Sequence, residues 1–191
     1  LMQIVIVLLL FLISLSPSWA WAIGARIENI EVEIIDQEIR GSFELARGFN
    51  RKIERDIHDG IEKDFFYYIV LTLKHENWFD EEIASKTLRY TVKYDTLKKI
   101  YTVNRREGMD RIERTFDRLE SMREFVSKGE RIIVAPLSVL KPNNRYFFLI
   151  KAQMKVSRVP LYLDRFLFFI PFLDLDTPWR KSRSIYATEG Q

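Results

Sequence analysis

Residues 64–105 read DFFYYIVLTLKHENWFDEEIASKTLRYTVKYDTLKKIYTVNR, and this stretch decides the fold. In residues 65–74 every odd position is apolar, residues 87–94 alternate apolar and polar side chains, and a third segment that includes Tyr101 and Val103 resumes the apolar face. Alternation with a period of two, built from aromatic and β-branched residues, is typical of a strand with one buried face. Residues 95–98 turn the chain between the second and third segments. We therefore expect three consecutive antiparallel strands at the centre of the domain.

The sequence on both sides of this core predicts more strands. The same alternation, or an apolar run bounded by turn residues, marks each of them. These segments are residues 26–34, 39–45, 132–140 and 145–156. The last two are separated by Lys-Pro-Asn-Asn, a turn sequence, and are expected to pair with each other as a hairpin.

Two helices are expected between the strands. Asn50 suits an N-cap, Ile53 and Ile57 lie one turn apart on a helix, and Gly60 suits a C-terminal stop. A longer helix is expected over residues 109–128, with a charged outer face, ended by the glycine that follows. The pattern predicts a mainly β (α+β) fold, an antiparallel two-layer β-sandwich-like domain with two helices.

The first 22 residues differ in composition from the rest of the chain, because they contain no Lys, Arg, Asp or Glu. Residues 4–13 are all apolar, a polar stretch with Pro17 follows, and Ala20-Trp21-Ala22 forms an A-x-A site. This order is typical of a secretory signal peptide, and the apolar run is shorter than the roughly 17–25 residues of a membrane span. We predict a signal peptide at residues 1–22 and a single mainly-β domain at residues 23–191. The alternative is an uncleaved anchor that attaches the domain to the inner membrane.

The composition excludes several classes of function. A hydrophobic content of 47% argues against disorder. The formal net charge of +3 is small, and acidic and basic residues are interleaved, so nucleic-acid binding is not expected. The chain has no cysteine, which excludes disulfides, thiol catalysis and thiolate metal sites.

Local catalytic, cofactor and metal motifs are absent from the sequence. No two of the seven glycines lie closer than seven positions, so neither phosphate-loop pattern can be written. His58 and His75 lack the short spacing of a metal site. The acidic run at residues 80–82, and Asp174 with Asp176, are more typical of surface or capping groups than of an acid/base pair. We predict no catalytic, cofactor-binding or metal-binding residues. A hydrolase whose residues are scattered in sequence remains an alternative.

Two groups of residues are candidates for an interaction surface. Trp78, Phe79 and Asp80 follow the first central strand, and Trp179 and Arg180 lie near the end of the chain. In one interpretation the tryptophans are buried and close the two ends of the sandwich. In the other they form an exposed aromatic surface for a partner.

Residues 166–172, which begin at Phe166 and end at Phe172, are the most apolar stretch after the leader. The first expectation is that they belong to the core. If exposed, they would contact a membrane surface or lipid, with basic residues near the headgroups.

A set of short motifs resembles a known family over essentially the whole mature chain. They are Gly60-Ile61, Trp78-Phe79-Asp80, Leu88-Arg89-Tyr90, Lys93-Tyr94-Asp95 and Asp176-Thr177-Pro178-Trp179. In this order they resemble the uncharacterised bacterial exported proteins catalogued as domain of unknown function 4390. The resemblance implies an exported envelope protein and no particular activity.

These observations favour an exported, periplasmic, non-catalytic envelope module that acts by protein–protein interaction with a partner yet to be identified. The alternative function is a carrier or sensor of a hydrophobic ligand, or a protein that binds the membrane surface.

Overall fold

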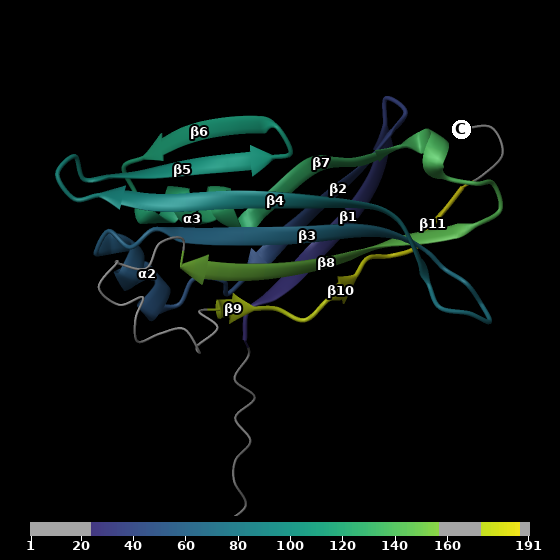
Figure 1. Cartoon of the computed structure of the whole chain (residues 1–191), viewed down its shortest axis with the longest axis horizontal. Helices are drawn as coiled ribbons and strands as arrows, with labels where there is room; N and C mark the ends of the chain where they lie inside the picture. The colour runs from purple at the N-terminus through teal and green to yellow at the C-terminus, as the bar shows by residue number, and fades with distance from the viewer. Residues whose placement is uncertain (1–23, 157–172, 188–191) are drawn as a thin grey trace, which may run out of the picture.

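The computed structural model describes residues 24–156 and 173–187 (Figure 1). These residues form two antiparallel sheets with two helices, so the predicted mainly-β, two-layer architecture is confirmed. The larger sheet has eight strands, in the order β10-β8-β3-β4-β5-β6, with β9 and β11 also pairing with β8. The smaller sheet has the order β1-β2-β7.

The elements follow one another along the chain as β1 (Arg26–Ile35), β2 (Glu38–Ala46), α2 (Arg51–His58), β3 (Lys63–Leu73), β4 (Glu81–Asp95), β5 (Ile100–Glu107), β6 (Asp110–Phe116), α3 (Leu119–Ser127), β7 (Lys128–Pro136), a 3-10 helix (Leu137–Val139), β8 (Arg145–Val156), β9 (Leu173–Asp176), β10 (Arg180–Lys181) and β11 (Ile185–Tyr186).

The three central strands form as the sequence predicts. β3 pairs with β4, and β4 pairs with β5, both antiparallel. Phe65 lies opposite Tyr90, and Val92 lies opposite Val103, and all four side chains are buried on the face toward the smaller sheet. The period of two therefore identifies the buried face correctly.

Tyr67 joins the two layers near the middle of the core. Its ring packs against Phe43 of β2 with a centroid distance of 5.0 Å. Its hydroxyl donates a hydrogen bond of 2.7 Å to the carbonyl oxygen of Val126 at the end of α3. Complete burial raises the pKa of Tyr67 well above its ordinary value. One side chain of β3 thus contacts both the smaller sheet and a helix.

The short helix α2 also follows its sequence signals. The side chain of Asn50 accepts a 2.9 Å hydrogen bond from the backbone N–H of Ile53, as an N-cap does. Ile53 and Ile57 are buried, and Gly60 has a positive φ of 86° just after the helix.

The prediction of one helix over residues 109–128 is wrong. Residues 110–116 form β6, and the helix α3 begins only at Leu119. Gly108, with a φ of 59°, turns the chain so that β6 pairs back on β5. The next glycine does not stop a helix but lies in β7, where an added Cβ would come within 2.3 Å of the Phe43 ring. Close packing, and not helix termination, requires Gly129.

The predicted hairpin between residues 132–140 and 145–156 is also wrong. β7 pairs with β2 in the smaller sheet, whereas β8 pairs with β3 in the larger one. The 3-10 helix and the turn after it carry the chain from one layer to the other. The turn sequence is compatible with either arrangement, and the long-range pairing with β2 decides between them.

Residues 173–187 pair with the edge of β8 that does not contact β3. The backbone N–H groups of Thr177 and Ser182 donate to the carbonyl oxygens of Ala152 and Phe148, each at 2.9 Å. The two hydroxyls accept from the N–H groups of the same two β8 residues, again at 2.9 Å. The two hydroxyls therefore accept hydrogen bonds that backbone carbonyl oxygens would accept in a regular strand.

Replacing Thr177 by Val, which has a similar shape but no hydroxyl, leaves the buried N–H of Ala152 without an acceptor. We expect the free energy of unfolding to fall by about 1–3 kcal/mol in urea denaturation. Thr177→Ser keeps the hydroxyl and serves as the control. Equal losses in both variants would contradict the assigned role of the hydroxyl.

A buried lysine fixes α2 against the larger sheet. Lys63, only 1% exposed, lies with its Nζ 2.7 Å from Oδ2 of Asp56 in α2. Burial acts to raise the pKa of Asp56, but hydrogen bonds from Lys63 and Lys52 outweigh it and hold that pKa below its ordinary value.

Asp56→Asn removes this charge pair, and we expect it to lower the free energy of unfolding at pH 7 by about 1–3 kcal/mol. Because the folded-state pKa of Asp56 is lowered, its stabilisation is complete above the ordinary pKa of 3.8 and is lost as the pH falls through the folded-state value. The difference between wild type and variant should therefore shrink below about pH 4. Asp59→Asn, an equal charge change on the exposed end of the same helix, is the control. A penalty that does not change with pH would contradict the account.

Candidate functional site

Trp78 and Phe79 lie at the tip of the β3–β4 connection, which projects from the end of the larger sheet opposite α2 (Figure 1). Their side chains are 81% and 86% exposed. The two rings contact each other edge to face, with centroids 6.4 Å apart. The interpretation of Trp78 as a buried lid is therefore wrong, because its ring covers no part of the core.

The tip is held in shape by the polar residues around it. Oδ1 of Asp80 accepts a 3.3 Å hydrogen bond from the backbone N–H of His75. Nε2 of His75 lies 3.3 Å from a carboxylate oxygen of Glu81. Four carboxylates within a few residues of the aromatic pair in sequence are exposed, at Glu76, Asp80, Glu81 and Glu82, and Glu82 also lines a groove on the outer face of the larger sheet. Aromatic surface and negative charge thus occur together at this end of the molecule.

Trp179 and Arg180 lie elsewhere. β10 pairs with the middle of β8, where Arg180 is opposite Ile150, and Ile150 is opposite Ile69 of β3. Trp179 is 48% exposed and lines a groove of about 400 Å³ on the outer face of the larger sheet, together with Tyr68 and Lys151. None of the described contacts joins it to Trp78. The five candidate residues thus form two separate surfaces.

The structure places the two histidines at opposite ends of β3. His58, at the end of α2, stacks on Tyr94 at 4.6 Å, and its Nδ1 lies 3.2 Å from the Tyr101 hydroxyl. His75 belongs to the tip. In the ranges 24–156 and 173–187, no group of three or more His, Asp or Glu side chains is placed to hold a metal ion.

The remaining candidates from the sequence are only partly described. Oδ1 of Asp176 lies 2.7 Å from Nζ of Lys151, which makes it one half of a surface ion pair. The apolar residues 166–172, between Phe166 and Phe172, lie outside the described residues.

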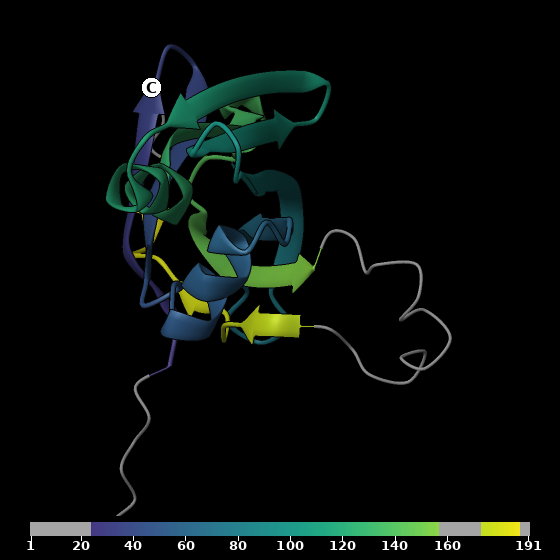
Figure 2. The same cartoon turned by 90° about the vertical axis from the view of Figure 1, so that its left-hand side faces the viewer.

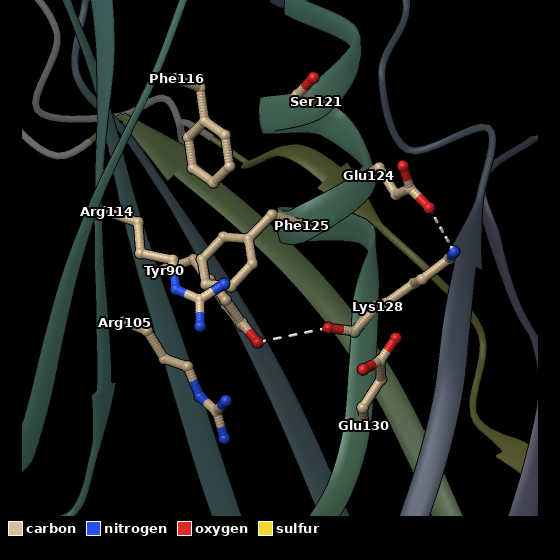
Figure 3. Close-up of a pocket in the computed structure, with 9 residues that line it drawn as sticks. All are labelled: Tyr90, Arg105, Arg114, Phe116, Ser121, Glu124, Phe125, Lys128 and Glu130. Carbon is tan, nitrogen blue, oxygen red and sulfur yellow. Dashed lines mark hydrogen bonds and ion pairs between the residues drawn. The ribbon is translucent and has the colours of Figure 1, made fainter.

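A cleft that the sequence did not indicate opens between the β5–β6 hairpin and α3 with β7 (Figure 3). Its volume is about 470 Å³. The side chains that line it are Tyr90, Arg105, Arg114, Phe116, Ser121, Glu124, Phe125, Lys128 and Glu130. The cleft was missed because residues 109–128 were predicted as one helix. The alternation of Ile112, Arg114 and Phe116 after a Gly-Met turn is the signal that would have indicated it.

Aromatic rings form the floor of this cleft. Phe125 contacts Tyr90 edge to face at 5.7 Å and Phe116 at 5.3 Å. The Tyr90 hydroxyl donates to the backbone carbonyl oxygen of Lys128 at 3.3 Å. Burial raises the pKa of Tyr90, Arg105 acts in the opposite direction, and Glu107 and Glu130 add to the rise. Tyr90 therefore remains a neutral donor at physiological pH.

No helix in the described part of the chain is both long enough and apolar enough to cross a membrane.

Comparison with known proteins gives one result. No curated protein and no solved structure matches the chain. The model of the family described as Domain of unknown function (DUF4390) matches residues 22–183, which is most of the sequence. The chain therefore belongs to this family, as the resemblance of its motifs predicted.

Proposed function

We propose that this protein is an exported, non-catalytic module of the cell envelope that acts by binding another envelope protein. The observation that carries the proposal is the nearly complete exposure of Trp78 and Phe79 at the end of a two-stranded projection. The contact surface is the tip formed by these two residues and their acidic neighbours.

The chemistry of the tip suits a protein interface. Large aromatic side chains bury roughly 150–250 Å² each and dominate the energetics of interfaces. Exposing two of them side by side to water is unfavourable unless a partner covers them. In this protein they make few contacts with the rest of the chain, so their burial would contribute to binding and not to folding.

The tip is also prepared for binding. The β3–β4 ladder continues to the pair Leu73 and Glu81, and Leu73 is buried. The Asp80–His75 hydrogen bond closes the turn beyond it. Because the backbone of the hairpin is already paired, it loses little conformational entropy when a partner binds, which favours affinity.

The charge of the tip favours a protein partner over an anionic membrane. The four carboxylates near the aromatic pair would be repelled by anionic lipid headgroups and attracted to a basic rim on a protein. The partner surface we infer has an apolar pocket for the two rings and Lys or Arg residues around it.

The proposed location rests on the amino-terminal segment. Its uncharged apolar run and A-x-A site are typical of a signal peptide, and the absence of cysteine removes any need for oxidative folding. The mass of the protein recovered from its host would test cleavage after Ala22.

Replacing both Trp78 and Phe79 by Ala should change the free energy of unfolding by less than about 0.5 kcal/mol, because both side chains are exposed. The same double variant should abolish co-purification of the partner after crosslinking in the native host. The matched control is Leu97→Ala, a 93% exposed apolar residue at a turn at the other end of the sheet. Equal partner recovery from the double variant and wild type would contradict the proposal.

A charge-reversal variant distinguishes binding to a protein partner from binding to a membrane surface. Glu76 and Glu82 are exposed, and changing both to Lys keeps the aromatic pair. We expect this variant to recover at least tenfold less partner protein, because two favourable contacts become repulsive. If the tip instead binds membranes, the variant should sediment more strongly with vesicles of phosphatidylglycerol than the wild type does.

A further inference from the structure

The cleft beside α3 exists because the inner face of the β5–β6 hairpin extends beyond the smaller sheet. Arg105 on β5 and Arg114 on β6 lie on this inner face, since Arg105 is opposite Tyr90 and Arg114 is opposite Val103. Figure 3 shows both guanidinium groups on the hairpin side of the cleft, with Glu124, Lys128 and Glu130 on the other side.

The two arginines keep hydrogen-bond donors that the described residues do not use. Nη2 of Arg105 is 2.8 Å from a carboxylate oxygen of Glu107, but its Nε is buried without an acceptor. Arg114 lies over the Phe125 ring, 4.9 Å from its centroid, and no described carboxylate forms an ion pair with it. A guanidinium stacked on a ring still presents its N–H edge to a ligand.

The opposite wall carries no uncompensated positive charge. Nζ of Lys128 is 2.7 Å from Oε1 of Glu124, so these two charges compensate each other. Glu130 is exposed at the rim. The unused positive charge of the cleft is therefore on the hairpin side, above the aromatic floor.

We propose that this cleft binds a carboxylate carried on an apolar or aromatic group. The carboxylate accepts hydrogen bonds from the exposed guanidinium of Arg114, with the positive charge of Arg105 beside it, and the apolar part lies on Phe125, Phe116 and Tyr90. This site is separate from the Trp78–Phe79 tip, and the inference does not depend on the proposed function.

A carboxylate fits better than the other charged groups. The planar fork of Arg matches the two carboxylate oxygens. A doubly charged phosphate would be repelled more strongly by Glu130 across the cleft, whereas a cation would meet Arg114 directly. A volume of about 470 Å³ is within the range of small-molecule sites, and the aromatic floor requires a ligand with an apolar part.

The test uses N-acetylphenylalanine as the probe and follows the backbone amide resonances of the whole folded chain by NMR. N-acetylphenylalanine amide has the same ring without the charge, and acetate has the charge without the ring. We expect saturable shifts at the cleft with N-acetylphenylalanine, and dissociation constants at least tenfold weaker for the other two compounds.

Variants on a single strand supply the matched pair. Arg114→Gln removes the inner-face charge, whereas Arg111→Gln makes the same change on the outer face of β6, where Arg111 contacts Asn104. Arg114 is exposed, so its variant should fold. Arg114→Gln should weaken the binding of N-acetylphenylalanine roughly ten- to hundredfold, and Arg111→Gln should leave it unchanged. Arg114→Lys keeps the positive charge but not the planar guanidinium, so its affinity for N-acetylphenylalanine should lie between those of the two Gln variants.

Decanoate distinguishes the source of the carboxylate. If it binds the same residues more tightly than N-acetylphenylalanine, the natural ligand is a fatty acid, and the reverse order assigns a peptide carboxylate. No saturable binding of either compound, equal binding of the neutral amide, or equal effects of Arg114→Gln and Arg111→Gln would overturn the proposal.

Discussion

The smaller sheet covers only part of the larger one. β1 packs against β8, and β7 packs against β3 and β4, so β5 and β6 extend beyond the second layer. Figure 2 shows the larger sheet curving from β8 at the bottom to β6 at the top, with α3 beside its upper end. α3 contacts β5 and β6 on one side and β2 and β7 on the other, and so covers part of the exposed inner face. Tyr67 holds this helix end in place through its hydrogen bond to Val126.

The same constraint explains which parts of the fold the sequence predicts. Strands covered on one face, such as β3 and β4, have an apolar residue at every second position over most of their length, because buried positions must be apolar. β6 is not covered by the smaller sheet and only partly covered by α3, and an arginine occupies an inner position there, so its alternation is weak. The spacing of Ile112, Phe116 and Leu119 also fits a helix, and this is why the sequence predicts one over residues 109–128. β7 pairs with β2, which is distant in sequence, so no local pattern in residues 128–136 predicts this pairing.

The candidate surfaces show the same division between local and non-local information. Trp78, Phe79 and Asp80 are adjacent in sequence, so the sequence alone identified them as a group, and the structure adds that they are exposed. Trp179 is also an exposed tryptophan, but it lies on a different surface, because β10 pairs with the middle of β8. The cleft brings together side chains from β4, β5, β6, α3 and β7, and it becomes visible only when the sheet curvature is known.

Placing a photoreactive amino acid at position 79, and separately at position 97, tests the central claim most directly in the native host with export intact. Both positions are exposed tips, at opposite ends of the sheet. The account predicts that one envelope protein crosslinks at position 79 in a stoichiometric amount and is not found at position 97. Crosslinking of the same protein at both positions, or of lipid alone at position 79, would contradict it.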